Sequence, residues 1–110
     1  MQTIVELPEY LRQAAAFLGE DEKLGIINTL ARNPTVGVVI TGTGGIRKLR
    51  WSRPGTGKSS GVRVVYFYFN QTMPLFLLTL FAKGEKANLS KSERNELAKL
   101  AQILRSHYAG

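Results

Sequence analysis

Lysine and arginine side chains gather in the middle of this chain, in a segment that bears almost no acid. Between Gly42 and Lys86 the single acidic residue is Glu85, and it stands against eight cations: Arg47, Lys48, Arg50, Arg53, Lys58, Arg63, Lys83 and Lys86. Guanidinium and ammonium groups bind phosphate oxygens through charge-assisted hydrogen bonds. A cluster of cations without compensating acids therefore indicates a phosphate-bearing partner, such as a nucleic acid.

The charge is also sorted along the sequence. Residues 1–44 hold three cations and five acids, whereas residues 45–110 hold twelve cations and three acids, and the whole chain carries a formal net charge of +7. Charge that served solubility alone would have no reason to be separated in this way. The second part of the chain is thus where we expect the binding surface.

The segment Ile46–Trp51 has the alternation of a strand, with Lys48 and Arg50 on one face and Leu49 and Trp51 on the other. The two cations then point the same way, about 7 Å apart along the strand. If the Leu49 and Trp51 face meets the helices, Lys48 and Arg50 project from the open face of the sheet. A basic face that serves only solubility is the alternative.

Two later strands add Arg63 and Lys83 to the same region. A meander of neighbouring strands would bring four cations, Lys48, Arg50, Arg63 and Lys83, into one concave site. Such crowding lowers stability unless a bound anion compensates it. Cations that cluster at this cost more often mark a phosphate site than a structural feature.

The elements that must position these cations form an α+β order. Alternating or β-branched segments predict strands at Thr3–Glu6, Val36–Ile40, Ile46–Trp51, Val62–Asn70 and Leu75–Lys83. Helical spacing predicts a hairpin of two helices between Pro8 and Asn33, and a last helix from Ser90 to about Tyr108 that opens with a capping box, Ser90 and Glu93. We expect the helix hairpin and the C-terminal helix to pack on a mostly antiparallel sheet of four to five strands.

Length and composition bound the class of protein. A chain of 110 residues predicts one domain, residues 1–110. It has no cysteine and one histidine, His107, which predicts no disulfide, no cysteine-based zinc site, no metal and no cofactor. The N-terminus lacks the pattern of a signal peptide, and no apolar run approaches the roughly 20 residues of a membrane span. These features predict a cytoplasmic protein without a membrane partner.

The loop Ser52–Gly61 contains Gly57-Lys58-Ser59, which is the end of a phosphate-binding P-loop motif. The motif also needs a glycine where this chain has Ser52, and it must open a helix, whereas a strand follows here. We therefore exclude nucleotide hydrolysis and expect a glycine-rich hairpin loop. On this loop Arg53 and Lys58 could close over a polyanion.

Three motifs in order carry a family resemblance: GTGGIRKLR, then GKSSGVRVVY, then LLTLFAKGEK followed by a serine-capped helix. Together they resemble the RelE/HigB superfamily of bacterial type II toxins, in particular its HigB-like members. The resemblance covers most of the chain and implies the same order of elements. It implies a toxin that cleaves mRNA in the ribosomal A site without a metal and is held inactive by a cognate antitoxin.

The resemblance also assigns roles to the cations. Arg63 would stabilise the phosphate, because a guanidinium grips two oxygens at once. Lys48 and Arg50 match the basic strand of the family, and Lys83 matches a basic residue after the last strand, so these four residues are the predicted catalytic set. Arg47, Arg53, Lys58 and Lys86 are predicted to bind RNA.

This chain departs from the family at Phe81, where many HigB-like relatives have a tyrosine. A phenylalanine ring cannot exchange a proton, so the protein either uses another group or has a core residue at this position. Tyr66 and Tyr68 are candidates for base stacking, although aromatic residues of a central strand are more often core. We assign no role to His107, which we expect at the surface.

Two other functions remain open on the sequence. A ParE-like toxin would inhibit gyrase without nuclease chemistry, and a plain nucleic-acid-binding domain would neither cleave RNA nor poison an enzyme. If the chain is instead the mRNA-cleaving toxin, the antitoxin would be acidic and, as in HigB-like systems, would carry a helix-turn-helix domain, which is this protein's indirect link to DNA. The acidic helix pair Pro8–Asn33 is one possible antitoxin surface.

Overall fold

The computed structural model of the chain describes residues 2–52, 61–86 and 88–108. Its elements are β1 (Ile4–Glu6), α1 (Pro8–Phe17), α2 (Glu20–Arg32), β2 (Val38–Val39), β3 (Ile46–Trp51), β4 (Val62–Phe67), β5 (Leu75–Ala82) and α3 (Lys91–Tyr108). The strands form one five-stranded sheet in the order β1-β5-β4-β3-β2. Strands β2 to β5 are an antiparallel meander, and β1 pairs with β5 in parallel. The predicted α+β fold is confirmed.

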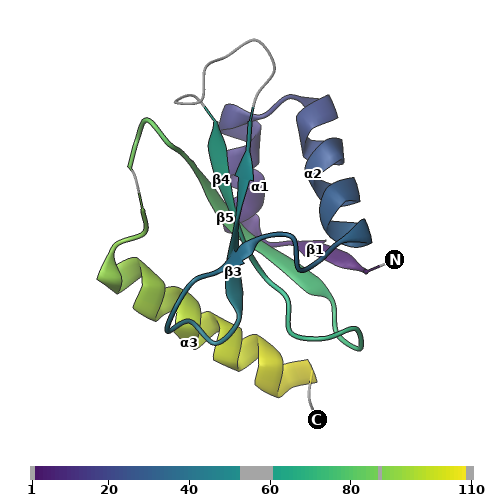
Figure 1. Ribbon diagram of the computed structural model, residues 1–110, viewed down its shortest axis with the longest axis vertical. Coiled ribbons are helices and arrows are strands. Elements are labelled where there is room, and N and C mark those ends of the chain that lie inside the picture. Colours follow the sequence, from purple (N-terminus) through teal and green to yellow (C-terminus); the bar gives the residue numbers. More distant parts are fainter. Residues whose placement is uncertain (1, 53–60, 87, 109–110) are drawn as a thin grey trace.

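The sheet has a hydrophobic cluster on each face. The helix pair α1 and α2 packs on one face and α3 on the other, as Figure 1 shows. Leu49 packs in the cluster under the helix pair, with Trp51 beside it, as the strand pattern predicts. On the opposite face Ile46, Val65 and Phe67 pack with Ala101 of α3. Because both faces are covered, all of β4 is buried.

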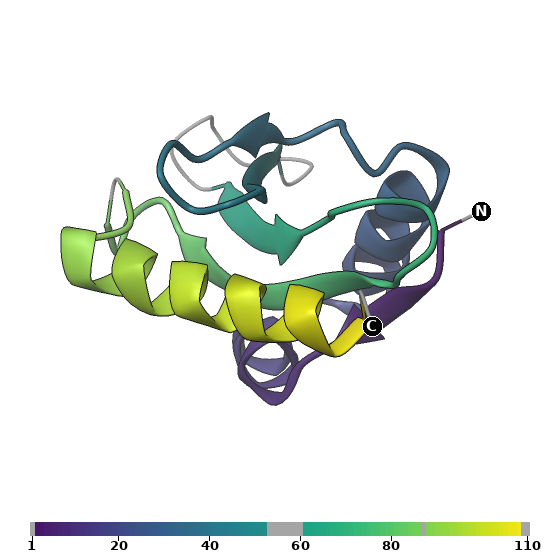
Figure 2. The ribbon, with the colours of Figure 1, turned by 90° about the horizontal axis from the view of Figure 1, so that it is seen from below.

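The sequence led us to expect an open sheet face around Lys48 and Arg50. This prediction is only partly right, because part of that face is covered. Helix α3 covers the part of it around Ile46, and the turn between β2 and β3 reaches toward this helix (Figure 2). The cations occupy the remaining part. The reason is that Ile46 shares its face with Lys48 and Arg50, and an apolar residue at that position needs a partner surface.

The turn between β2 and β3 explains the glycines of the GTGG motif. Gly42, Gly44 and Gly45 all have positive φ, at 79°, 74° and 115°. The Thr43 hydroxyl, which is buried, donates to the carbonyl of Ile40 at 2.6 Å. Residues with a Cβ rarely adopt such a backbone, so this run is needed for the turn itself.

Tyr66 of β4 anchors the connection between α2 and β2. Its hydroxyl accepts a hydrogen bond from the Gly37 N–H and donates one to the Pro34 carbonyl, both at 2.8 Å. The approach is so close that a Cβ on Gly37 would lie 2.7 Å from the tyrosine oxygen. The ring is fully buried, so Tyr66 is a core residue and not a platform for base stacking. Tyr68 is partly buried against the same cluster.

Two strands are shorter than predicted by three residues each, and β1 and β5 by one residue each. Strand β2 has two residues instead of the five of Val36–Ile40. The Gly37 N–H, just before the strand, is bound to the Tyr66 hydroxyl of β4 and so does not pair with β3. Strand β4 ends at Phe67 and not at Asn70. The Asn70 side chain accepts a hydrogen bond from the Thr72 N–H at 2.9 Å, which begins a turn.

The capping box of the last helix is confirmed. Ser90 N–H donates to the Glu93 carboxylate at 2.8 Å, and Glu93 N–H donates to the Ser90 hydroxyl at 3.1 Å. His107 is exposed near the end of this helix, as expected. Across the described ranges no helix combines the length and the apolar content that crossing a membrane requires.

Removing the Tyr66 hydroxyl should destabilise the fold. Tyr66→Phe leaves the Gly37 N–H and the Pro34 carbonyl without this partner, which costs about 1–3 kcal/mol of unfolding free energy. Urea denaturation measures the change. Tyr68→Phe is the matched control and should stay within about 0.5 kcal/mol of the native chain. Equal stability of both variants would show that the Tyr66 hydroxyl does not anchor this connection.

Candidate functional site

The register of β3 and β4 brings three of the four predicted catalytic cations together. Arg50 lies directly opposite Arg63, and Lys48 lies opposite Val65, two residues along the strand. All three share the face on which Ile46, Val65 and Phe67 pack toward α3. Like charges directly opposite each other on a sheet are destabilising, so this arrangement is costly for the isolated protein.

Arg63 is the most unusual of these cations. Arg63 is only 6% exposed, and its Nη1 atom is buried without a hydrogen-bond partner among the described residues. Burial, and then the neighbouring charge of Arg50, lowers the pKa of Arg63 below its ordinary value. A guanidinium keeps its charge nonetheless. The site therefore holds a buried positive charge whose Nη1 donor is not used by the residues that the structure describes.

A pocket of about 320 Å³ lies against these cations. Its walls are Val36, Val38, Lys48, Leu49, Arg50 and Arg63. Val36, in the connection that Tyr66 anchors, and Val38, in β2, are exposed apolar residues, and Val38 pairs with Lys48 in the sheet. The pocket thus combines an apolar wall with a cationic one, which is what a nucleotide, with its base and its phosphate, requires.

Lys48 also belongs to a neighbouring pocket of about 300 Å³, lined by Ile40, Asn88, Leu89 and Arg94 as well. The ammonium group of Lys48 donates to the side-chain oxygen of Asn88 at 3.0 Å. Neither Asn88 nor Arg94 stands out in the sequence, because an asparagine before a helix and a cation on the polar side of a helix are both ordinary. Their one signal in the sequence is that they flank the predicted helix cap at Ser90.

Phe81 lies directly opposite Arg63 on β5 and is buried in the cluster under α3. The ammonium group of Lys86 lies over its ring, 5.1 Å from the centroid. Lys86 also forms an ion pair with Glu93. The hydrogen bond from Lys86 is the largest cause that lowers the pKa of Glu93, and the hydrogen bond from the Ser90 N–H is the second. Phe81 is therefore a core residue beside the site, and the charge of Lys86 is partly neutralised.

The remaining predicted residues do not join the pocket. Arg47 is on the opposite face of β3, where its guanidinium donates to the carbonyls of Thr35 at 3.2 Å and Gly37 at 2.8 Å. Lys83 is exposed after the end of β5 and is not among the described residues that line the pocket. Arg53 and Lys58 lie outside the described residues. Strand alternation alone separates Arg47 from Lys48 and Arg50.

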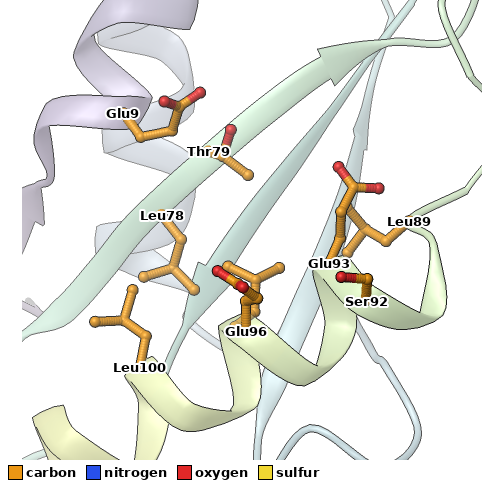
Figure 3. A pocket seen from close by; sticks show the side chains of 9 residues that line it. Glu9, Leu78, Thr79, Leu89, Ser92, Glu93, Glu96 and Leu100 are labelled. Atoms are coloured by element: carbon orange, nitrogen blue, oxygen red, sulfur yellow. The ribbon is translucent and has the colours of Figure 1, made fainter.

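A third hollow, between α1 and α3, has the opposite character (Figure 3). Leucines form its floor, and the carboxylates of Glu9, Glu93 and Glu96 lie around it. Its volume of about 440 Å³ exceeds that of the cationic pocket. Carboxylates repel phosphate, so a polyanion that meets Arg63 would avoid this side of the molecule.

Comparison with known proteins gives one family. The family model described as "RelE toxin of RelE / RelB toxin-antitoxin system" matches residues 39–109. The matched segment contains β3, β4, β5 and α3, and with them Lys48, Arg50 and Arg63.

The buried charge of Arg63 should lower the stability of the free protein. Arg63→Met fills the same space without the charge, and we expect it to raise the unfolding free energy by about 1 kcal/mol. Chemical denaturation of the two proteins measures this. A loss of stability would contradict the assignment, since it would mean that the guanidinium is compensated within the fold.

Proposed function

The chain belongs to the RelE family of toxins from toxin–antitoxin systems, and on this premise we propose that it is an endoribonuclease that cleaves mRNA in the ribosomal A site and so stops translation. The observation that carries the proposal is Arg63, a buried cation with an unused donor, directly opposite Arg50 in a cationic pocket. Such a pre-formed positive site suits a group that gains negative charge as it reacts.

RNA cleavage without a metal is the reaction that this site supports. The 2′-hydroxyl passes its proton to solvent water as it attacks the adjacent phosphorus, and the bond to the 5′-oxygen breaks, leaving a 2′,3′-cyclic phosphate and a 5′-hydroxyl. Arg63 and Arg50 would hold the phosphate and stabilise the extra charge of the transition state. Lys48 would give the proton that the departing 5′-oxygen takes up, because arginine does not release one.

The other cations take lesser parts in this proposal. Lys83, exposed near the end of β5, would meet the RNA only at the rim of the site. Lys86 would contribute little, since Glu93 pairs with it. Arg47 would act indirectly, because its bonds to Thr35 and Gly37 fix the connection that carries Val36 and leads into Val38 of β2.

Mapping of mRNA 5′ ends after brief induction of the chain tests the proposal. The native protein should produce new ends within translated codons. In Arg63→Ala, cleavage should fall by about 10²–10³, the usual loss when a group that stabilises transition-state charge is removed. Arg12→Ala removes an exposed cation of α1 instead and should cleave like the native chain.

Three results would contradict the proposal in different ways. Ends that persist in Arg63→Ala would remove Arg63 from the site. Growth arrest with intact mRNA and signs of DNA damage would favour gyrase as the target. Nucleic-acid binding without either effect would leave a binding domain alone.

We further propose that the acidic helix pair is part of the antitoxin surface. Glu20 and Asp21 are exposed at the start of α2, and Leu11 and Leu24 are large apolar residues that are 49% and 58% exposed on the same pair. An antitoxin with a helix-turn-helix domain could dock here and block entry to the ribosome without covering the pocket.

Charge reversal tests this surface. Glu20→Lys with Asp21→Lys should weaken antitoxin binding about tenfold or more in calorimetry, because two attractive contacts become repulsive. Unchanged binding, with binding lost instead in Arg50→Ala, would show that the antitoxin covers the cationic pocket.

A further inference from the structure

Two pockets meet at Lys48. The first contains Arg50 and Arg63, and the second contains Asn88 and Arg94. Lys48 reaches from β3 to Asn88, which precedes α3, with 3.0 Å between the ammonium nitrogen and the amide oxygen. The cationic surface therefore does not end at the edge of the first pocket. It continues from the sheet onto the start of α3.

Helix α3 sorts its charges between two sides. Glu93 and Glu96 line the acidic hollow toward α1, where Figure 3 shows them. Arg94, between them in sequence, lines the pocket beside β3. A polyanion on Arg63 is thus repelled on one side of α3 and attracted on the other. This leaves a path past Lys48 toward Arg94.

The second pocket has the groups that a phosphate and its sugar need. Lys48 and Arg94 supply charge, and the Asn88 side chain has an amide nitrogen that can donate. Ile40 and Leu89 provide apolar surface beside them. A phosphate contact of this kind positions a strand without reading its sequence.

We infer that Lys48, Asn88 and Arg94 form a second phosphate subsite, which binds the nucleotide next to the one whose phosphate meets Arg63. Lys48 lies between the two phosphates and contacts both. The inference rests on the proposed function, because it takes the Arg63 pocket as the place of the reacting phosphate. It adds a positioning residue, Arg94, that holds the RNA strand in line with the site.

Binding of a 2′-O-methyl RNA oligonucleotide tests the subsite, because this strand cannot be cleaved. Fluorescence anisotropy with the full chain, at several salt concentrations, gives the affinity and its salt dependence. Arg94→Ala should weaken binding about three- to fivefold. It should also reduce the slope of log affinity against log salt by about 0.7, the loss of one phosphate contact to a single strand.

Lys99→Ala is the matched control, since Lys99 is an exposed cation of the same helix that lines neither cationic pocket. Equal effects of Arg94→Ala and Lys99→Ala would overturn the subsite, because general attraction would then explain both. No effect of Arg94→Ala would overturn it as well. Arg94 is exposed, so its replacement should leave the fold intact.

Neutral linkages locate the two phosphates. In a series of oligonucleotides with one methylphosphonate each, the effect of Arg94→Ala should vanish at one position, and that of Arg63→Ala at the adjacent one. The same position for both would overturn the inference. The proposed cleavage has its own test in the mRNA 5′ ends. If the native chain cleaves mRNA but Arg94→Ala binds the oligonucleotides with native affinity and salt dependence, the subsite alone is refuted. Binding in this pattern without cleavage refutes the nuclease alone.

Discussion

The pairing of Arg50 with Arg63 is the constraint on which the rest of the site depends. The two arginines are paired residues of neighbouring strands, and one of them, Arg63, is buried. Such a pair costs stability. The apolar residues of β4 and β5, packed between helices on both faces, offset this cost by burying hydrophobic area. The fold thus stabilises a charge arrangement that is unfavourable until an anion binds.

Hydrogen bonds from Tyr66 and Arg47 fix the backbone beside the pocket. Tyr66 and Arg47 both bind the connection between α2 and β2, Tyr66 through Gly37 and Pro34, and Arg47 through Thr35 and Gly37. This connection carries Val36 and leads directly into Val38 of β2, and both valines line the pocket. Arg47, although a cation of the basic strand, is thereby a structural residue. Strand β3 thus carries the pocket cations Lys48 and Arg50 on one face. On the other face its Arg47 holds the connection between α2 and β2.

Acidic residues define where the cationic surface stops. Glu93 caps α3, binds Lys86 and lines the hollow toward α1. One carboxylate thus fixes the helix that closes the site, neutralises a cation beside it and repels phosphate from the far side. If the pocket binds RNA as proposed, this distribution sets the direction in which the strand leaves Arg63.

The order of elements, the capping box of α3 and the face of β3 that carries Lys48 and Arg50 could be predicted from the sequence, because periodicity and capping are local properties. It also indicated a phosphate-binding role through charge, and the RelE family through its motifs. Strand register and helix packing were needed to learn that Arg63 is buried opposite Arg50, that Arg47 and Lys86 are engaged elsewhere, and that Asn88 and Arg94 line a pocket with Lys48. These facts depend on strand register and on the placement of α3, which arise from packing between segments distant in sequence.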